Sequence, residues 1–444
     1  MSNQVITIYD FLLLPLYLFL FYILVKRRSL KIQDADLRKI FIIAFALRMF
    51  GSILYSLMVQ YYYGYGDSFT FYGGGDFILE QIQADFSNIK YLYAPSSELQ
   101  RVYSLENGKV GGVNGYIALD SSVAVMKASA VVGILTLNKY LITSLFFGLF
   151  SFAGQWKLFL VFNDINKKQN QKLLAIAVLY TPATWFWGSG LIKESICLGG
   201  LGFIISILYK AIIKKKVAPM DWVWLVILAY IVYVVKSYVI EIFVVSIFFT
   251  TLFTLFQKIK LIIIRASLSV LTLLILYFSL SLSNFSEQIT ELAEESVIQI
   301  ESFQRNYQIS QQTDESSKAG FEIGSVTPTF GGMLLRSPGI IFSCLFRPFL
   351  WESRKLIILF SALESTLLLL ATLFLLFKTR IFGFFKLVFT EPYIFFCFII
   401  TLLFAAIIGF TTFNFGTMVR YKIMLMPFLY FMLVHIYTKI VKKT

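Results

Sequence analysis

A series of apolar runs, many of them about twenty residues long, constrains the fold of this chain more than any other feature. About twenty apolar residues in a helix cross the hydrocarbon core of a bilayer, and a helix satisfies its own backbone hydrogen bonds there. Hydrophobic residues make up 58% of the 444 residues and charged residues only 14%, a balance that no soluble domain of this size would carry. The sequence therefore predicts an all-α protein, a polytopic bundle of transmembrane helices.

Short clusters of Lys and Arg predict the direction of each span, because cytoplasmic loops carry an excess of these residues. The first apolar run begins after Asp10 and is followed by Lys26-Arg27-Arg28. A cleavable signal has its positive charge in front of the apolar run. We therefore expect a retained first span with the N-terminus outside. The basic C-terminal tail, with Lys442 and Lys443, predicts a cytoplasmic C-terminus.

The apolar pattern predicts about eleven spans in a single integral membrane domain over residues 1–444. After the first span we expect the others at about 39–60, about 140–162, from about 173 to Gly188 and Gly190 with a kink at Pro182, about 195–210, two within 222–256, about 261–282, a ninth that runs to Lys378, about 392–412 and an eleventh that ends at Lys439. Two polar segments predict large outer loops, at 64–138 and 284–354. The second includes Pro338 to Glu352, which is too short for a full span and is expected to lie in the outer interface.

A charged pair between two apolar runs, Lys193-Glu194, is the first candidate for a functional site. It follows a segment in which Pro182 would kink a helix and Gly188 and Gly190 would end one. Ionisable residues at a membrane edge are costly and are functional candidates by default. The alternative interpretation is that the pair simply caps a tight turn at the lipid headgroups.

Asp67 is the second candidate, because it stands where the second span is predicted to leave the membrane. It is surrounded by glycines, which permit unusual dihedrals and a close backbone approach to a ligand. Loop residues at a membrane mouth often carry function. The alternative is an N-cap role, in which the carboxylate accepts otherwise unpaired backbone N–H groups at the start of a short helix.

Further charged residues fall at or near predicted outer ends of spans, namely Asp76, Lys236, Glu241, Arg347, Glu352, Arg420 and Lys422. We expect a cavity there of mixed charge. Its cations suit a phosphate or pyrophosphate, with Arg favoured for bidentate contact, and a carboxylate beside them suits deprotonation of an attacking hydroxyl. Trp187 suits stacking on a sugar face, with a role in the interfacial aromatic belt as the alternative. Arg48 and Glu364 lie about ten residues inside predicted spans; for Arg48, snorkelling to the cytoplasmic edge and lining the cavity are both open.

Four short pieces of the chain carry a resemblance to a known family. They are Gly66-Asp67, Pro182 with Phe186 to Glu194, Arg347-Pro-Phe-Leu-Trp-Glu352, and Asn414 to Tyr421. These pieces resemble the bacterial envelope-polysaccharide membrane glycosyltransferases of the GT-C type. In that family the catalytic loop follows the first span, whereas here the corresponding loop follows the second.

The resemblance implies an activity and a location. The activity is transfer of a sugar from a polyprenyl-phosphate-linked donor to a saccharide acceptor, in the synthesis of envelope polysaccharide or glycoconjugates. The location is the periplasmic face of the bacterial inner membrane. By resemblance Asp67 acts as general base or positions the acceptor, and Lys193, Arg347 and Arg420 hold the polyprenyl phosphate. With the other charged candidates, we expect Asp67 and Glu194 to be catalytic and the following residues to bind substrate: Lys193, Lys236, Glu241, Arg347, Glu352, Arg420, Lys422 and Trp187.

Two alternatives remain beside single-sugar transfer. One is a polysaccharide polymerase or ligase, whose donor is a repeat unit on a polyprenyl pyrophosphate held by Arg347 and Arg420. The other is a transporter of lipid-linked saccharides or a non-catalytic envelope assembly subunit. A transporter needs access to both faces, whereas the candidate charges, apart from Arg48 and Glu364, are confined to one side.

Partners and cofactors follow from the same residues. Membrane lipids are expected partners, and nucleic acid is not, because the net charge of +14 comes mainly from clusters that flank apolar runs. No cofactor is certain; a divalent cation such as Mg²⁺ or Mn²⁺ is an open possibility on carboxylate oxygens. The single His, His435, leaves no room for a His-based metal cluster, and the three cysteines are expected to be packing thiols.

Overall fold

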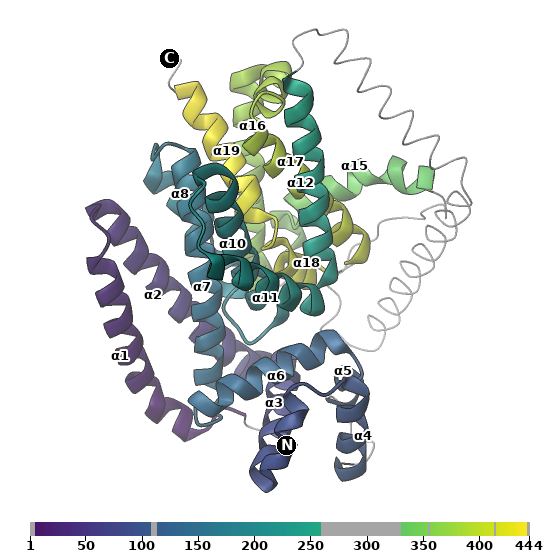
Figure 1. Cartoon of the computed structure of the whole chain (residues 1–444). Helices are drawn as coiled ribbons and strands as arrows, with labels where there is room; N and C mark the ends of the chain where they lie inside the picture. Colours follow the sequence, from purple (N-terminus) through teal and green to yellow (C-terminus); the bar gives the residue numbers. More distant parts are fainter. Residues whose placement is uncertain (1–4, 108–112, 259–329, 354–355, 413, 442–444) are drawn as a thin grey trace. The chain divides into compact units, whose positions relative to one another are not determined.

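The computed structural model describes residues 5–107, 113–258, 330–353, 356–412 and 414–441 (Figure 1). Every regular element in these ranges is a helix, as the sequence predicts. Seven of the described helices are long and apolar enough to cross a membrane, and an eighth span results if the bent pair α18 and α19 is counted as one. The predicted number of eleven spans is not confirmed. The chain divides into two compact units, residues 1–241 and 242–444.

The first unit contains twelve helices of α type and three short 3₁₀ or π segments among its described residues. In chain order they are α1 (Ile8–Leu30), α2 (Ala35–Met58), η1 (Val59–Tyr63), α3 (Asp67–Ala84), η2 (Phe86–Leu92), α4 (Ser96–Asn107), α5 (Val113–Ile117), α6 (Asp120–Leu135), α7 (Tyr140–Ile165), α8 (Gln171–Leu179), α9 (Pro182–Trp187), α10 (Lys193–Tyr209), η3 (Lys210–Lys214), α11 (Pro219–Val235) and the start of α12 (Ser237–Gln257).

Helices α7 and α10 form the core of this unit, and glycines let their backbones touch. A Cβ atom built on Gly154 would lie 1.9 Å from the carbonyl oxygen of Gly199, and one built on Gly202 would lie 2.2 Å from the carbonyl oxygen of Gly154. Small residues at a helix crossing allow this close approach, which membrane helices use because burial of apolar surface does not drive their association. The positions of Gly154, Gly199 and Gly202 therefore determine where α7 and α10 cross.

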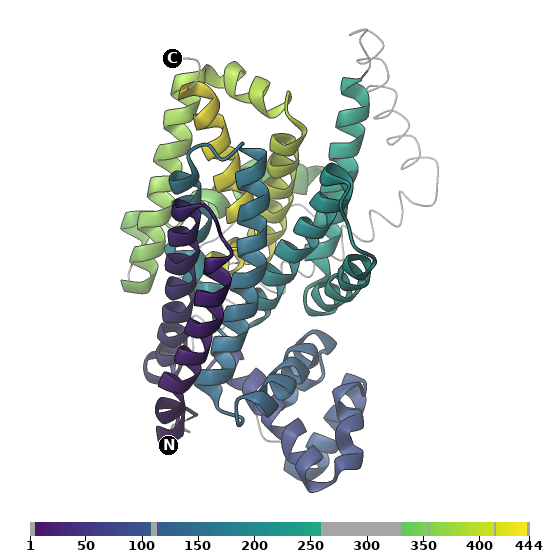
Figure 2. The ribbon, with the colours of Figure 1, turned by 60° about the vertical axis from the view of Figure 1, so that its left-hand side comes forward.

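The segment predicted as the first outer loop is folded. It forms α3 to α6, a group of short helices gathered at one end of α2 and α7 (Figures 1 and 2). Helix α3 packs on α6 through consecutive glycines: a Cβ atom on Gly74 would lie 2.4 Å from the sulfur of Met126, and one on Gly75 would lie 2.8 Å from Oγ of Ser129. This close packing holds α3 and α6 together, and side chains from α3, α5 and α6 come into contact there.

The fourth predicted span is interrupted at Pro182 and ends at Gly188, as predicted, but it forms two short helices and not one membrane-spanning helix. Helix α8 has nine residues and α9 has six, and Pro182 stands at the first position of α9. Nine residues of helix rise about 14 Å, less than half of the roughly 30 Å of a bilayer core. The break arises because Pro lacks the N–H that would continue α8 and disfavours helical dihedrals in the residue before it. The eighth predicted span, about 261–282, lies outside the described residues.

Among its described residues, the second unit contains the rest of α12 and six further elements: α15 (Phe330–Phe346), η5 (Leu350–Glu352), α16 (Leu356–Val388), α17 (Pro392–Thr411), α18 (Phe415–Lys422) and α19 (Met426–Val441). Helix α12 packs on α17 through stacked rings of Phe253 and Phe395, whose centroids are 4.2 Å apart. Helix α15 covers the predicted interfacial segment as far as Phe346. Helices α18 and α19 meet at a bend of 62°.

Candidate functional site

Lys193 begins α10, directly after the turn that ends α9. Its ammonium Nζ donates a hydrogen bond of 2.9 Å to Oγ of Ser121, at the start of α6. The same ammonium lies over the ring of Phe71 in α3, 5.8 Å from the ring centroid. A cation over an aromatic face is attracted by the ring quadrupole. Lys193 is half-buried, and it joins α10 to the group of helices α3 to α6.

Asp67 is the first residue of α3 and is half-buried. Gly66, immediately before it, has a φ of 147°, a conformation essentially restricted to glycine. The hydroxyl of Tyr116 donates a hydrogen bond of 2.8 Å to Oδ1 of Asp67. The Tyr116 ring in turn meets the ring of Phe71 edge-on, with centroids 5.9 Å apart. Asp67 is thus hydrogen-bonded to Tyr116, and the Tyr116 ring contacts Phe71, the residue over which the ammonium of Lys193 lies.

Phe71 therefore connects the two candidates that the sequence places far apart. Its ring lies under the ammonium of Lys193 and against Tyr116, the hydrogen-bond donor to Asp67. Sequence reasoning missed Phe71, Tyr116 and Ser121. Nothing in the sequence singled them out, because an aromatic or a serine in a polar segment is ordinary, and only the packing of α3 on α5 and α6 brings these three together.

Glu194 is fully buried, next to Lys193 in the first turn of α10. Its Oε1 lies 2.8 Å from Nζ of Lys236, whose side chain is only 8% exposed. Lys236 is the residue at which α11 ends, and its ammonium also lies 5.7 Å from the ring centroid of Tyr238. Removing one partner of a buried ion pair is strongly destabilising, because the other charge stays buried. This pair ties α10 to the break between α11 and α12.

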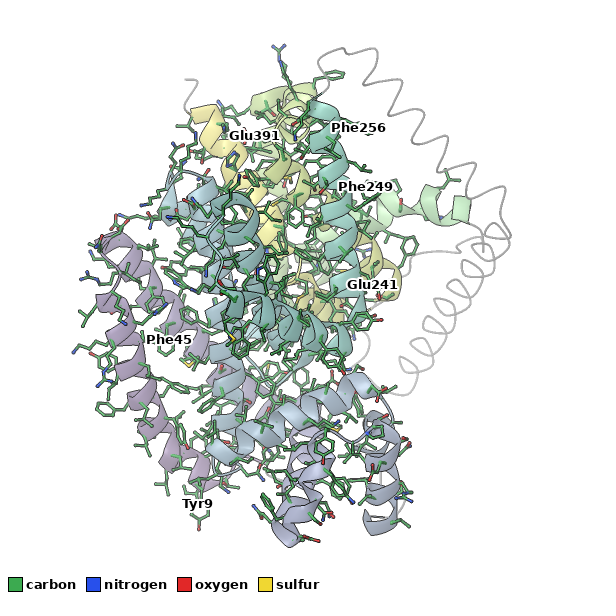
Figure 3. All side chains as sticks on the ribbon, in the orientation of Figure 1. Tyr9, Phe45, Glu241, Phe249, Phe256 and Glu391 are labelled. Atoms are coloured by element: carbon green, nitrogen blue, oxygen red, sulfur yellow. The ribbon has the colours of Figure 1, made fainter. Side chains whose placement is uncertain are left out.

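Three further candidates in the first unit have different surroundings. Trp187 is 8% exposed and packs edge-on against the rings of Tyr55 and Phe186. Asp76 accepts a hydrogen bond from the side-chain amide of Asn138. Glu241, near the start of α12, is exposed (Figure 3). Within the described ranges, the ring of Phe71 contacts Lys193 and Tyr116 instead.

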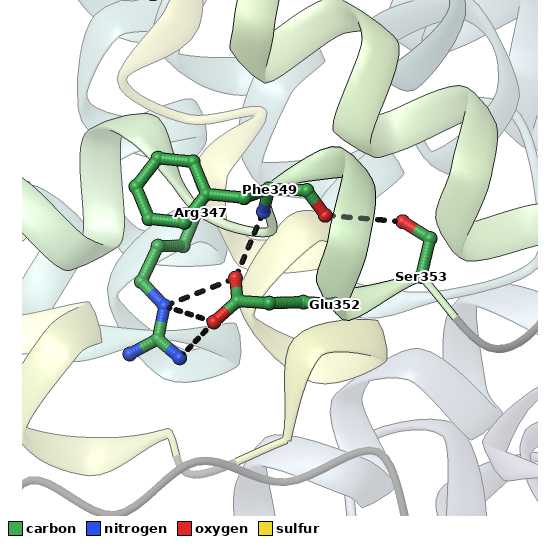
Figure 4. Close-up of polar contacts among 4 residues, drawn as sticks. All are labelled: Arg347, Phe349, Glu352 and Ser353. Atoms are coloured by element: carbon green, nitrogen blue, oxygen red, sulfur yellow. Dashed lines mark hydrogen bonds and ion pairs between the residues drawn. The ribbon is translucent and has the colours of Figure 1, made fainter.

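In the second unit, Arg347 and Glu352 form a forked ion pair (Figure 4). Nε of Arg347 donates to both carboxylate oxygens of Glu352, at 2.9 and 3.1 Å, and Nη2 donates to Oε1. The backbone N–H of Phe349 donates to Oε2 at 2.8 Å. The guanidinium also lies 5.2 Å from the ring centroid of Phe415. Two planar contacts therefore fix the orientation of Arg347.

Lys422 and Arg420 lie in the last turn of α18. Lys422 is 2% exposed, and its ammonium donates to the carbonyl oxygens of Leu345 and Arg347 and to Oγ of Ser365, at 3.1, 3.0 and 3.3 Å. Arg420 lies over the ring of Tyr421, 5.4 Å from its centroid. Lys422 thus holds the end of α15, while Arg420 is the half-buried cation of the pair.

Metal binding stays a prediction. The described residues contain no group of three or more His, Cys, Asp or Glu side chains arranged to hold an ion. The three cysteines are all buried, as expected of packing thiols. The arrangement around Phe71 offers a different chemistry: a half-buried ammonium, that of Lys193, over its ring, and a half-buried carboxylate, that of Asp67, hydrogen-bonded to Tyr116, whose ring contacts Phe71.

Comparisons place no further constraint on this site. We compared the chain with protein-family models, with curated proteins and with solved structures, and none of the three gives a match.

Proposed function

We propose that this chain is a membrane glycosyltransferase of the GT-C type that takes its sugar from a polyprenyl-phosphate-linked donor, at the periplasmic face of the bacterial inner membrane. One observation carries the proposal: Asp67 and Lys193, from distant segments, are connected through Phe71 and Tyr116 at the end of a bundle of apolar helices. A lipid-linked substrate needs such a place, since its tail stays in the bilayer while its headgroup meets charged residues.

In the proposed reaction, a hydroxyl oxygen of the acceptor saccharide forms a bond to the anomeric carbon of the donor sugar. The bond between that carbon and the phosphate oxygen breaks, and the polyprenyl phosphate leaves with the electron pair. The hydroxyl proton passes to the carboxylate of Asp67 as general base. The ammonium of Lys193 binds the phosphate and stabilises the charge that develops on it. Glu194 holds Lys236 and so fixes the beginning of α10.

A second candidate function rests on Arg347. Its guanidinium is oriented by Glu352 and Phe415, and a planar fork of this kind suits the bidentate recognition of a phosphate or pyrophosphate. This favours a polymerase or ligase that uses a polyprenyl-pyrophosphate-linked repeat unit. The two functions share the same reaction and differ in the donor, so that the size of the transferred saccharide separates them.

The test uses decaprenyl phosphate as the probe and the purified full-length protein in nanodiscs. We expect Lys193→Gln to weaken decaprenyl phosphate binding by roughly tenfold, because a charge-assisted contact to phosphate contributes about 1.5–3 kcal/mol. The matched control is Lys90→Gln, since Lys90, in η2, also lies over a ring, that of Tyr91. Decaprenol, which lacks the phosphate, should bind equally well to wild type and to both variants. Equal binding by wild type and Lys193→Gln would remove Lys193 from the phosphate site.

Asp67→Asn tests the chemical step. We expect normal membrane levels and unchanged binding of decaprenyl phosphate, but a loss of about 10²–10⁴-fold in sugar transfer, the usual contribution of a general base. In cells, polymer output should fall and the lipid-linked donor should accumulate. A single sugar on the accumulated lipid supports the first function, and an oligosaccharide supports the second. Normal polymer from this variant would exclude the role proposed for Asp67.

A further inference from the structure

Two side chains one turn apart on α2, Arg48 and Ser52, hold the turn that precedes Lys193. Nη1 of Arg48 donates a hydrogen bond of 2.7 Å to the carbonyl oxygen of Gly188. Oγ of Ser52 donates one of 2.8 Å to the carbonyl oxygen of Ser189. Carbonyl groups at the C-terminal end of a helix lack partners within the helix. At the end of α9, side chains of α2 supply these partners.

Arg48 is almost completely buried, with 1% of its surface exposed. Besides the carbonyl of Gly188, its guanidinium donates to Oγ of Ser151 at 3.1 Å and to the side-chain carbonyl of Gln155. All these partners in the described part of the chain are neutral. A buried charge is costly unless hydrogen bonds replace its water. The stability of the buried guanidinium therefore depends on the positions of its hydrogen-bond acceptors, and the guanidinium in turn holds these acceptors in place.

Gln155 extends the same contacts to α8. Its amide Nε2 donates a hydrogen bond of 2.6 Å to the carbonyl oxygen of Val178, in the last turn before the break at Pro182. Arg48 and Gln155 together thus join α2, α7, α8 and the end of α9. These contacts hold the broken segment on both sides of Pro182, at the end of α8 and at the end of α9. The snorkelling interpretation of Arg48 does not fit its burial.

Glycines allow the turn to lie directly against α2. A Cβ atom on Gly188 would lie 2.4 Å from Nη1 of Arg48, and one on Gly190 would lie 2.2 Å from the ring of Tyr55. On the facing helix, a Cβ atom on Gly51 would lie 2.2 Å from the carbonyl oxygen of Trp185. The turn therefore lies directly against α2, with the hydrogen-bonded groups in contact.

From these contacts we infer that Arg48 and Ser52 are positioning residues that fix the location of Lys193 and Glu194. Their hydrogen bonds go to the backbone of Gly188 and Ser189, and they act through the backbone from Gly188 to Ile192, which enters α10. Their relevance to sugar transfer rests on the proposed function above. Arg48 cannot be exchanged for Lys, because one ammonium does not reproduce a planar fork that donates to three separate groups.

The experiment measures backbone hydrogen exchange in the full-length protein in detergent micelles, comparing Arg48→Met, Arg48→Lys and Ser52→Ala with wild type. We expect exchange in peptides that cover residues 188–196 to become roughly tenfold faster in Arg48→Met, since local opening reports the hydrogen bonds lost there. Arg48→Lys should behave similarly, and Ser52→Ala should show a smaller increase. Peptides from α3 to α6 should be unchanged. The control is Arg38→Met, which removes a charge from α2 outside this set of contacts.

The outcomes separate this inference from the proposed function. Faster exchange confined to 188–196, together with weaker binding of decaprenyl phosphate, supports both. The same exchange result with no binding of decaprenyl phosphate by wild type supports the positioning role and removes the proposed donor. Unchanged exchange in a folded Arg48→Met protein overturns the inference. If Arg48→Met does not fold, unchanged exchange at residues 188–196 in Ser52→Ala overturns the inference.

Discussion

At the scale of single residues, Asp10 is a buried charged group with specific hydrogen-bond partners. Asp10 is fully buried near the start of α1, yet its Oδ2 accepts hydrogen bonds from the N–H and hydroxyl of Thr7, and its Oδ1 accepts one from the N–H of Leu141 in α7. One carboxylate therefore caps two helices at once. Removing such a partner leaves buried donors unsatisfied, so these residues are expected to tolerate little change.

Glu391, just before α17, gives a prediction about pH. Its carboxylate lies 2.9 Å from Nε2 of His435 and 2.8 Å from Nζ of Lys439. The hydrogen bond from His435 is the largest of the causes that lower the pKa of Glu391, from 4.5 to about 2. A depressed pKa in the folded state means that the contribution to stability is complete above about pH 4.5 and is lost as the pH falls towards 2.

We therefore expect Glu391→Gln to lower the melting temperature in detergent at pH 6, and the difference from wild type to shrink progressively as the pH falls below about 4.5. Thermal unfolding followed by intrinsic fluorescence across this range is the measurement. A difference that stays constant down to pH 2.5 would contradict an ionised, hydrogen-bonded Glu391. Asp85→Asn is the comparison variant: the Asp85 carboxylate is exposed and its pKa is lowered mainly by the backbone N–H of Ser87, so a smaller pH-dependent difference is expected there.

At the scale of elements, the arrangement of helices depends on where glycines permit contact. The crossing of α7 and α10 brings Gly154 against Gly199 and Gly202. The broken segment α8 and α9 lies against α2 in the same way, through Gly188 and Gly51. Both are places where a single methyl group would have to move a backbone.

Gly154→Ala is the corresponding test. The added Cβ would lie 1.9 Å from a backbone oxygen, so α7 and α10 must separate, and overpacking of this kind typically costs about 1–3 kcal/mol. We expect a lower melting temperature than wild type. Gly339→Ala on α15 is the matched control, since a Cβ there meets nothing within 4 Å, and Ala in a helix is favoured over Gly by about 0.5–1 kcal/mol. Equal stability of both variants would show that the crossing is looser than described.

At the scale of the whole molecule, the predicted topology places the segment 64–138 outside and the basic cluster near Lys215 inside. The described structure contains seven or eight helices able to span a membrane but does not by itself orient them. The native cysteines, Cys197, Cys344 and Cys397, are buried. A cysteine introduced at an exposed position is therefore expected to be the main site of labelling by a membrane-impermeant thiol reagent.

We expect Tyr93→Cys, at a position 77% exposed, to be labelled in intact spheroplasts. Lys215→Cys, in the connection between α10 and α11, should be labelled only after the membrane is permeabilised, because basic connections remain in the cytoplasm. The reverse pattern would place the proposed site on the cytoplasmic face and would exclude a periplasmic donor. Labelling of both in intact spheroplasts would indicate that the cells had lysed.

The sequence by itself determined the helical class, the positions of most long apolar helices and the candidates Asp67, Lys193 and Glu194. Hydropathy and helix hydrogen bonding are local, and a charge in an apolar chain is conspicuous wherever it lies. Tertiary structure alone decided that α8 and α9 form no full span, that Phe71 and Tyr116 join Asp67 to Lys193, and that Arg48 holds the turn before α10. These contacts join residues far apart in the chain, and their partners are neutral or aromatic groups whose identity carries no signal until packing brings them together.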